Sequence, residues 1–594
     1  MVADLGEVCW VVDLNRQSLD RVVPNIGATR LQEMFGAAGW QVLTVKYGRL
    51  LHELFARPDG DALMRRIDEM PNPEYQRLLR CTPAELRERL PGKGSDAEPL
   101  TALMATLSDD TALRAIRNLG GHDLQALDES FAAIDDTVPT VMFAYTIKGH
   151  GLASEGHPQN HSSLLTVEQL AELADRAGMS VEEPWQRFAE DSTPGKLCAE
   201  AATRLRRAPV PAPRALQIPT DLGRTPGGSA TTQAALGRTL MDLTRQAPEV
   251  AGQVVTLCPD VSSSTNLGGW VNKVGVWSVS ERQDWFSDDP DTILHWREWP
   301  TGQHLELGIA EVNLVGLLGE LGATWSRWGE PLLPIGVLYD PFVERALEPW
   351  SFGIYAGGQS ILVGTPSGVT LAAEGGAHQS ITTASVGLEQ PGCVAYEPAF
   401  ALDLEWTLLA SLARLGRPDG TSAYLRLSTR PVDQTLAAVP TDADLRERRR
   451  RQVVAGAYVV RRAAGRPALT IAAMGAVLTE ALAAADALTA LGTDTDVVCV
   501  SSPQRLFEAV QARDGQGESP SWILSAAFPA HRSAPLVTVL DGHPHTLAFL
   551  AGINSVRARH LGVTQFGQSG DLAEVYRHYH LDSGSIVSAA LDLL

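Results

Sequence analysis

LPIGVLYDPF (333–342) and SILVGTPSG (360–368) are the two segments that decide the fold of this chain. Each is a short apolar run that ends in turn-forming residues, and a longer amphipathic stretch separates them. Apolar runs of this length are typical of strands buried on both faces of a parallel sheet. The same pattern predicts further strands at 254–260, 393–398 and 423–428. The central block is therefore predicted to be an α/β domain, with a parallel sheet flanked by helices.

Two further α/β blocks flank the central one. The first has predicted strands at 9–14, 41–48 and 140–149, a helix around 29–39, and amphipathic stretches within 51–136. The last has strands at 469–475, 496–502 and 536–542 with a helix at 478–492, which is βαβ patterning. A Pro-rich stretch (208–229) and a charge-rich one (about 431–452) are predicted linkers. The predicted domains are 1–207, 228–432 and 453–594, with linkers at 208–227 and 433–452.

Composition and charge limit the function. Of the 594 residues, 44% are hydrophobic and 20% charged, as in ordinary globular proteins. The net charge of −21 disfavours nucleic acid and anionic membranes as partners. No apolar run is long enough for a transmembrane helix, and no signal peptide is visible. Six separated cysteines without a CxxC pair fit a cytoplasmic protein and argue against a zinc ribbon or iron–sulfur site.

Chemically active residue types gather in the central block. Glu311 lies within the apolar segment HLELGIAEVNLVG (304–316), where a carboxyl group must be paired, protonated or facing a cavity; an exposed helical glutamate is an equally good interpretation. Tyr339 and Phe342 follow a predicted strand and could form an aromatic platform. His378 lies in a glycine-rich loop with Glu374, at a strand end where ligands of parallel sheets bind.

Together these segments resemble a known family. GQHLELGIAE (302–311), LYDPF (338–342) and TPSGVTLAAEGGAHQS (365–380) are similar to the pyrimidine-binding domain of thiamine diphosphate enzymes. The similarity is greatest to the transketolase-like group that includes the homodimeric decarboxylating component of pyruvate dehydrogenase. PDVSSSTNLGGWVNK (259–273), NLGGHD (118–123) and YTIKGHGL (145–152) also resemble that group, so the resemblance runs in order along the whole chain. It implies a transketolase-like fold with a C-terminal α/β domain.

The resemblance implies a role for each matching residue of the central block. Glu311 matches the glutamate that hydrogen-bonds the cofactor's aminopyrimidine ring; a carboxyl group in an apolar pocket favours its neutral form, so it can protonate the ring and promote ylid formation. Phe342 matches the aromatic residue that stacks on this ring, with Tyr339 beside it. His378 matches a substrate-facing histidine, an acid or base near neutral pH, and Asp260 matches an active-site acid.

The first block is similar to the end of a diphosphate-binding motif. In VVDLNRQSLD (11–20), the resemblance implies that Asn15 is a magnesium ligand, with a second oxygen from Gln17 or its backbone. HPQNHSS (157–163) resembles a mobile inner loop whose active-site histidine would be His161. Lys148 could neutralise phosphate, although it and His122 could equally be structural.

The chain departs from the family at one point. The glycine–aspartate–glycine string that opens the diphosphate motif, with its aspartate magnesium ligand, is missing upstream of Asn15. The expectation is that a second polypeptide supplies it, or that a misplaced start codon has removed it. The family's cofactor bridges two protomers, so a dimer or a dimer of heterodimers is expected.

The shared motifs leave the donor open. A 2-oxo acid such as pyruvate would lose carbon dioxide and load a lipoyl or carrier-protein arm; the NLGGHD and inner-loop strings favour this reading. A ketose phosphate would instead pass a two-carbon unit to an aldose, as in transketolase. A non-catalytic or regulatory subunit is the alternative of another class. The basic run RERRRRQ (446–452) is predicted to be part of a solvated linker.

Overall fold

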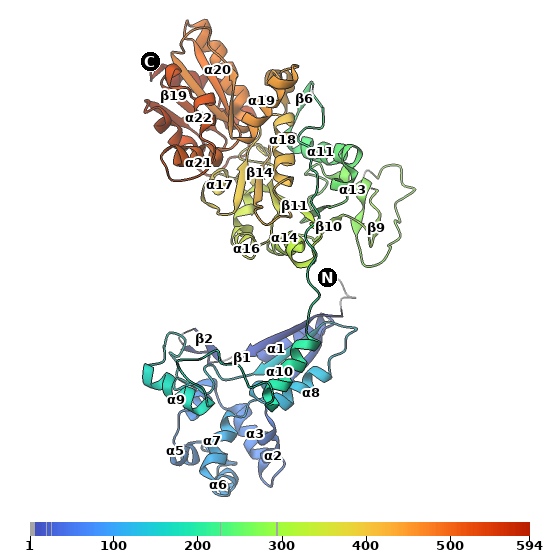
Figure 1. Ribbon diagram of the computed structural model, residues 1–594, viewed down its shortest axis with the longest axis vertical. Coiled ribbons are helices and arrows are strands. Elements are labelled where there is room, and N and C mark those ends of the chain that lie inside the picture. The colour runs from blue at the N-terminus through green and yellow to red at the C-terminus, as the bar shows by residue number, and fades with distance from the viewer. Residues whose placement is uncertain (1–5, 20, 25–26, 226, 293–294) are drawn as a thin grey trace. The chain divides into compact units, whose positions relative to one another are not determined.

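The chain forms two compact units, Met1–Arg207 and Ala208–Leu594, in the computed structural model (Figure 1). The structure describes residues 6–19, 21–24, 27–225, 227–292 and 295–594. Each unit is described separately below.

The first unit is built on a small parallel sheet. Its strand order is β1 (Cys9–Leu14), β5 (Thr140–Tyr145), β4 (Gln41–Val45), which confirms the three predicted strands. The predicted helix is α1 (Ala28–Ala37). A helical cluster follows β4, and its apolar faces form one core; it consists of α2 (Arg49–Phe55), α3 (Gly60–Glu69), α4 (Asn72–Leu78), α5 (Pro83–Arg89), α6 (Ala97–Ala105) and α7 (Asp109–Arg117). The remaining elements are β2 (Gln17–Ser18), β3 (Arg21–Val22), α8 (Leu124–Ala132), α9 (Val167–Ala177) and α10 (Thr193–Arg204).

Strand β1 is an edge strand with apolar side chains in solvent. Among the described residues it pairs only with β5. Trp10 is 54% exposed and Val11 45% exposed, although Trp10 makes edge contacts with Phe35 and Trp40. Strands of parallel sheets are normally covered on both faces. The β1 side of this sheet is therefore less well covered than is usual for a parallel sheet.

The second unit contains an eight-stranded parallel sheet. The order is β13 (Cys393–Tyr396), β14 (Ser422–Arg426), β12 (Ile361–Gly364), β11 (Leu333–Leu338), β7 (Val254–Cys258), β10 (His304–Glu306), β8 (Val276–Trp277), β9 (Glu298–Trp299). One face is covered by α11 (Thr232–Gln246), α12 (Pro248–Ala251), α13 (Gly268–Val274) and α18 (Ala401–Leu412). The other is covered by α14 (Glu311–Gly322), α16 (Val343–Tyr355) and α17 (Val386–Glu389), with α15 (Thr324–Trp328) following α14. The five strands predicted in the central block are confirmed.

The C-terminal part of this unit has its own five-stranded sheet, orange to red in Figure 1. The order is β16 (Ala457–Arg461), β18 (Thr495–Val500), β17 (Leu469–Met474), β19 (Leu536–Leu540), β20 (Ala558–Leu561), and only β16 runs antiparallel. Its helices are α20 (Leu478–Ala490), α21 (Pro503–Arg513), α22 (Trp522–Ala527), α23 (His545–Ala548), α24 (Leu572–His578) and α25 (Ser583–Leu591). The predicted βαβ arrangement is confirmed.

The charge-rich segment, a predicted linker, is helical in its second half. It folds as α19 (Ala443–Val454), capped by the Asp442 side chain. Arg446 hydrogen-bonds both carboxylate oxygens of Asp221 at 2.8 and 3.1 Å, and Arg449 lies 4.3 Å over the Tyr458 ring. These arginines contact the half-buried Asp221 and the buried Tyr458, while the rest of the basic run stays partly exposed to solvent.

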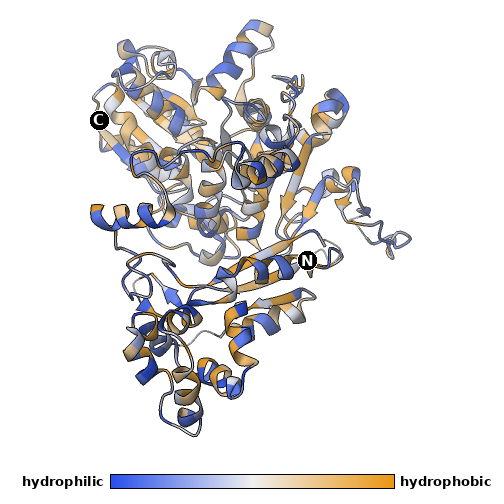
Figure 2. Ribbon diagram, turned by 60° about the horizontal axis from the view of Figure 1, so that its bottom comes forward, coloured by the Kyte–Doolittle hydropathy of each residue, from blue (hydrophilic) through white to orange (hydrophobic). Residues whose placement is uncertain are grey.

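Apolar side chains fill the space between the sheets and their helices. In Figure 2 the strands are mainly orange, the colour of hydrophobic residues, whereas the helices carry both colours. The largest buried side chains include Trp270, Trp350 and Trp406. Among the helices that the structure describes, none combines the length and hydropathy needed to cross a membrane.

One buried carboxyl group makes the stability of the second unit depend on pH. Glu405 in α18 is 3% exposed, and its Oε1 accepts a hydrogen bond from the Leu222 N–H at 2.8 Å. Burial raises the pKa of Glu405 from 4.5 to about 7, and the neighbouring Asp221 and Asp242 add to this. Because the folded-state pKa exceeds the unfolded one, the stabilisation is complete below about pH 4.5 and is lost as the pH rises through about 7.

We therefore predict that the free energy of unfolding falls less steeply between pH 5 and 8 in Glu405→Gln than in the wild type. Raising a carboxyl pKa from 4.5 to about 7 corresponds to up to roughly 3 kcal/mol between its protonation states. Urea unfolding of wild type and variant across this range measures the difference in slope. The exposed Glu249→Gln serves as the control. Identical slopes for wild type and Glu405→Gln would show that Glu405 does not titrate in this window.

Candidate active site

Four neighbouring strands of the eight-stranded sheet end at the same edge. In the order β12, β11, β7, β10 they are all parallel, so their carboxyl ends lie together. The residues predicted from the sequence follow these strands: Asp260 after β7, Glu311 after β10, Tyr339 and Phe342 after β11, and His378 after β12. The structure therefore brings Asp260 and His378, which are 118 positions apart in the chain, to one edge of the sheet.

Tyr339, Phe342 and His378 form a small aromatic cluster. The Tyr339 and Phe342 rings are nearly parallel, with 21° between their planes and 6.2 Å between centroids. The His378 ring approaches both edge-on, at 5.9 Å from Tyr339 and 5.8 Å from Phe342. The imidazole Nδ1 lies 3.4 Å from the Glu374 carboxylate. A flat apolar surface thus stands beside a group that can exchange protons.

Glu311 is buried, which decides between the two interpretations of its sequence. Its residue is 5% exposed, at the first position of α14. One oxygen lies 3.7 Å from a guanidinium nitrogen of Arg345, and that guanidinium lies 4.4 Å over the Phe342 ring. Arg345 therefore joins the carboxyl group to the aromatic pair. Sequence reasoning missed Arg345, although its position three residues after Phe342, at the start of α16, was an available signal.

Asp260 lies at the same edge but apart from the aromatic cluster. It follows β7 in the left-handed conformation, with φ of 64°, and its backbone N–H donates to Glu306 Oε1 at 2.6 Å. Glu306 also contacts His304 Nε2 at 3.1 Å. The nearest link to the cluster is Ser264, whose Oγ accepts from the Tyr339 hydroxyl at 2.9 Å.

Asp340 ties the aromatic pair to the loop that carries His378. It is fully buried between Tyr339 and Phe342, and its Oδ2 accepts from Ser380, from Thr383 Oγ1 at 2.7 Å and from Arg426 Nε at 2.9 Å. Its Oδ1 accepts from the Tyr424 hydroxyl. A carboxylate with all its acceptor positions filled is held rigidly. The hydrogen bonds of Asp340 therefore fix the position of Phe342 relative to the loop that carries His378.

Arg426 is the centre of that cluster. The residue is 2% exposed, and Nη1 donates to Glu397 at 2.7 Å and to the Asp541 backbone carbonyl at 2.9 Å. Burial raises the pKa of Glu397 to about 7 and that of Asp541 to about 6, against the opposing effect of Arg426. Sequence reasoning missed Arg426, because an arginine at the end of a strand gives no sign of the three carboxyl groups that surround it.

In the first unit, Gln17 is occupied by structural hydrogen bonds. Its Nε2 donates to the carbonyls of His157 and Pro158 and to Asn160 Oδ1, each at 3.2 Å, and its Oε1 accepts from Gln76 at 2.9 Å. The side chain thus anchors the segment before His161. The backbone N–H of Gln17 donates to Asn15 Oδ1 at 3.0 Å, which leaves that oxygen a second lone pair.

Lys148 and His161, candidates from two separate family-like strings, lie together. Lys148 Nζ is 3.1 Å from His161 Nδ1 and 3.2 Å from the Leu19 carbonyl. Because an ammonium only donates, His161 Nδ1 accepts and its Nε2–H is left to donate. His122 instead accepts from the Ile147 N–H at 2.7 Å and stacks on His150, so it has a structural role.

The two units offer different chemistry. The sheet edge of the second unit presents aromatic faces, a buried carboxyl group and an imidazole, which suit a flat, partly basic heterocycle. The first unit presents amide oxygens, an ammonium and an exposed imidazole. Among the described residues no cluster of three or more His, Cys, Asp or Glu side chains is suited to hold a metal ion.

Two family models match this chain. The model described as "Pyruvate dehydrogenase E1 component middle domain" matches residues 216–426, which contain the whole sheet edge from Asp260 to His378. The model described as "Transketolase-like TK C-terminal domain" matches residues 456–582.

Full-length relatives point in the same direction. The pyruvate dehydrogenase E1 components of Cupriavidus necator and Corynebacterium glutamicum are each 26% identical, over 99% and 100% of this chain and 68% and 67% of their own length. That of Escherichia coli K12 is 24% identical over 99% of this chain and 68% of its own. This chain therefore spans about two thirds of these relatives.

Solved structures share the fold. The transketolases of Campylobacter jejuni and Leishmania mexicana superpose with TM-scores of 0.62 at 16% identity, over 99% of this chain and 73% and 72% of theirs. At this identity the likeness concerns the fold alone. The predicted transketolase-like architecture is confirmed.

Proposed function

Because the chain belongs to the transketolase-like thiamine diphosphate enzymes, we propose that it cleaves a 2-oxo acid such as pyruvate next to the carbonyl group and transfers the two-carbon unit. One observation carries the proposal. Glu311, the Tyr339–Phe342 pair and His378 meet at a single sheet edge, within the segment that matches the middle domain of pyruvate dehydrogenase E1.

The residues at this edge fit the pyrimidine part of thiamine diphosphate. Phe342 and Tyr339 would hold the ring on their faces, and Glu311 would hydrogen-bond it from a buried position. When bound, the cofactor would supply a nucleophilic carbon for reaction at the donor carbonyl. His378 would exchange a proton with the substrate oxygen, and Asp260 would bind the polar end of the donor. His161 would be the candidate acid of the first unit.

The first unit would bind the diphosphate end. Asn15 Oδ1 and the Gln17 backbone carbonyl would be ligands of Mg²⁺, because the Gln17 side-chain oxygen already accepts from Gln76. Lys148 would neutralise phosphate charge. Neither of these two oxygens is charged, and Mg²⁺ at phosphate sites is usually held by one or two carboxylates, so a carboxylate ligand would come from another segment.

That segment would belong to a partner chain with the glycine–aspartate–glycine motif. The unpaired edge of β1 supports this, since a parallel strand added there would cover Trp10 and Val11 and lie next to Asn15. We propose a dimer or a heterotetramer in the cytoplasm, with a lipoyl or carrier-protein acceptor. The three functional regions would be 1–207, 228–432 and 453–594.

Pyruvate turnover tests the proposal. The chain is combined with the polypeptide that carries the missing motif, and carbon dioxide release and reduction of an artificial electron acceptor are measured with thiamine diphosphate and Mg²⁺. Pyruvate-dependent activity that requires both polypeptides is expected. Consumption of ketose phosphates alone, with an aldose as acceptor, would replace the proposal by transketolase. Full activity of the partner without this chain would make the chain a non-catalytic subunit.

A further inference from the structure

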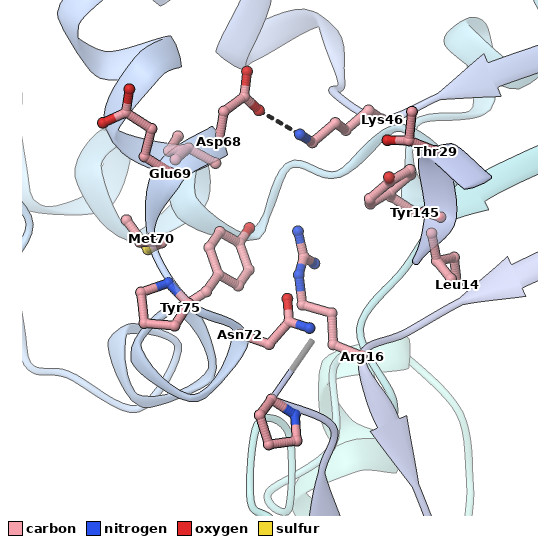
Figure 3. Close-up of a pocket in the computed structure, with 14 residues that line it drawn as sticks. Leu14, Arg16, Thr29, Lys46, Asp68, Glu69, Met70, Asn72, Tyr75 and Tyr145 are labelled. Carbon is pink, nitrogen blue, oxygen red and sulfur yellow. Dashed lines mark hydrogen bonds and ion pairs between the residues drawn. The ribbon is translucent and has the colours of Figure 1, made fainter. Parts of the chain in front are cut away.

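A polar pocket lies next to the metal-ligand loop of the first unit, on the side of Arg16. Its volume is about 400 Å³, and its walls come from the end of β1, from the first turn of α1 and from the segment that joins α3 to α4. Arg16 stands at its base, and Lys46, Asp68 and Glu69 also line it. Figure 3 shows the Arg16 guanidinium reaching into this pocket between the rings of Tyr75 and Tyr145.

Arg16 is a buried cation without a carboxylate of its own. The residue is 7% exposed, and its backbone adopts the left-handed conformation, with φ of 63°. The guanidinium carbon lies 4.2 Å from the Tyr75 ring centroid and 5.5 Å from that of Tyr145. No hydrogen bond or ion pair joins this guanidinium to another residue that the structure describes. The two rings contact the faces of the guanidinium, so the N–H groups at its edge are directed into the cavity.

The acidic residues of the pocket do not neutralise Arg16. Asp68 pairs with Lys46 and also accepts from the Tyr47 hydroxyl, so its charge is already satisfied. Asp68 and Glu69 are both exposed, at the mouth of the pocket, where water screens them. The base of the pocket therefore keeps an uncompensated positive charge, which is costly in a buried position.

We propose that this pocket binds a small oxyanion, a carboxylate or a phosphate, on Arg16. A guanidinium edge presents paired N–H donors at the spacing of two oxyanion oxygens, which is the bidentate arrangement such groups favour. The volume of about 400 Å³ accommodates a group of this size. Lys46, whose side chain is 28% exposed and pairs with Asp68, also lines the pocket.

Because of its position, an anion bound in this pocket would affect the loop around Arg16. Arg16 lies between Asn15 and Gln17, and its backbone carbonyl accepts from the Val23 N–H at 2.9 Å. An anion held by Arg16 would fix this loop through the arginine backbone. The pocket and its ligand depend only on residues of the first unit, so the proposal stands whether or not the proposed reaction is correct.

The test uses the full chain without cofactor. Inorganic phosphate and acetate are titrated separately at constant ionic strength, and binding is followed by calorimetry and by the shift in unfolding temperature. Saturable binding of at least one of the two is expected, and the one that binds identifies the source as phosphate or carboxylate. Since charge-assisted hydrogen bonds change binding constants by roughly 10- to 100-fold, Arg16→Met should weaken binding by that factor.

Two controls keep the result decisive. Arg30→Met removes an exposed arginine from α1 and should leave binding unchanged. Arg16→Lys keeps the charge and the fold but loses the paired donors, so it should show an intermediate affinity even if Arg16→Met is unstable. Absence of saturable binding by both anions, or equal binding by wild type and a folded Arg16 variant, would overturn the proposal.

Discussion

Glu311→Gln is expected to lower the turnover of the assembled enzyme by about 10²–10⁴-fold, the usual contribution of general acid–base catalysis. The carboxyl group lies in the apolar first turn of α14 and faces the aromatic pair through Arg345. An amide of almost the same volume keeps the shape of the site and loses the exchangeable proton. Hydrogen–deuterium exchange at the thiazolium carbon of the bound cofactor measures the affected step directly.

The matched control for this prediction lies on the same helix. Glu320 is 65% exposed in α14 and pairs only with Arg327 among the residues described, so Glu320→Gln should leave both exchange and turnover unchanged. The unfolding midpoint of Glu311→Gln should remain close to wild type. Unchanged exchange at the thiazolium carbon in Glu311→Gln would remove this residue from the mechanism.

Arg426→Met is expected to lower the free energy of unfolding of the second unit by about 3–5 kcal/mol at pH 8. Removing one partner of a buried ion pair leaves uncompensated charge, and here three carboxyl groups share one arginine. Glu397 and Asp541, with pKa values raised to about 7 and 6, take up protons as the pH falls. The loss should therefore shrink between pH 8 and pH 5.5, which urea unfolding at both pH values measures.

An exposed ion pair provides the comparison. Arg417 bonds Asp419 at 2.7 Å on the surface of the same unit, and such pairs contribute about 0–1 kcal/mol. Arg417→Met should therefore have little effect at either pH. A loss in Arg426→Met as small as that in Arg417→Met would show that the buried cluster is not a source of stability.

The fold could be predicted from local pattern because its strands are strongly apolar. The runs around Ile335 and Leu362 have no polar residue to place in solvent, so they had to be internal strands of a parallel sheet. The packing of α19, in contrast, could not be predicted from local pattern. Its arginines gain partners such as Asp221, which is more than 200 residues away, and a charge run alone cannot reveal such partners.

The candidate site was predictable to the same extent. Phe342 and His378 each follow a predicted strand, whereas Glu311 follows β10, which the sequence pattern does not predict; parallel topology places these strand ends at one edge. Arg426 could not be found in this way, because its importance comes from side chains that reach it in space, whereas the spacing of Arg345 from Phe342 was an available signal. Local sequence therefore predicts which loops form the site, whereas the charged groups that hold those loops emerge only with the tertiary structure.

The open edge of β1 also governs how this protein can exist by itself. Along Cys9–Leu14 the charged side chain is Asp13, and the segment has no proline, lysine or bulge to block a further strand. A free chain offers this template to any extended polypeptide, including another copy of itself. An exposed edge of this kind favours edge-to-edge aggregation, so the solubility of the free chain is expected to fall as its concentration rises.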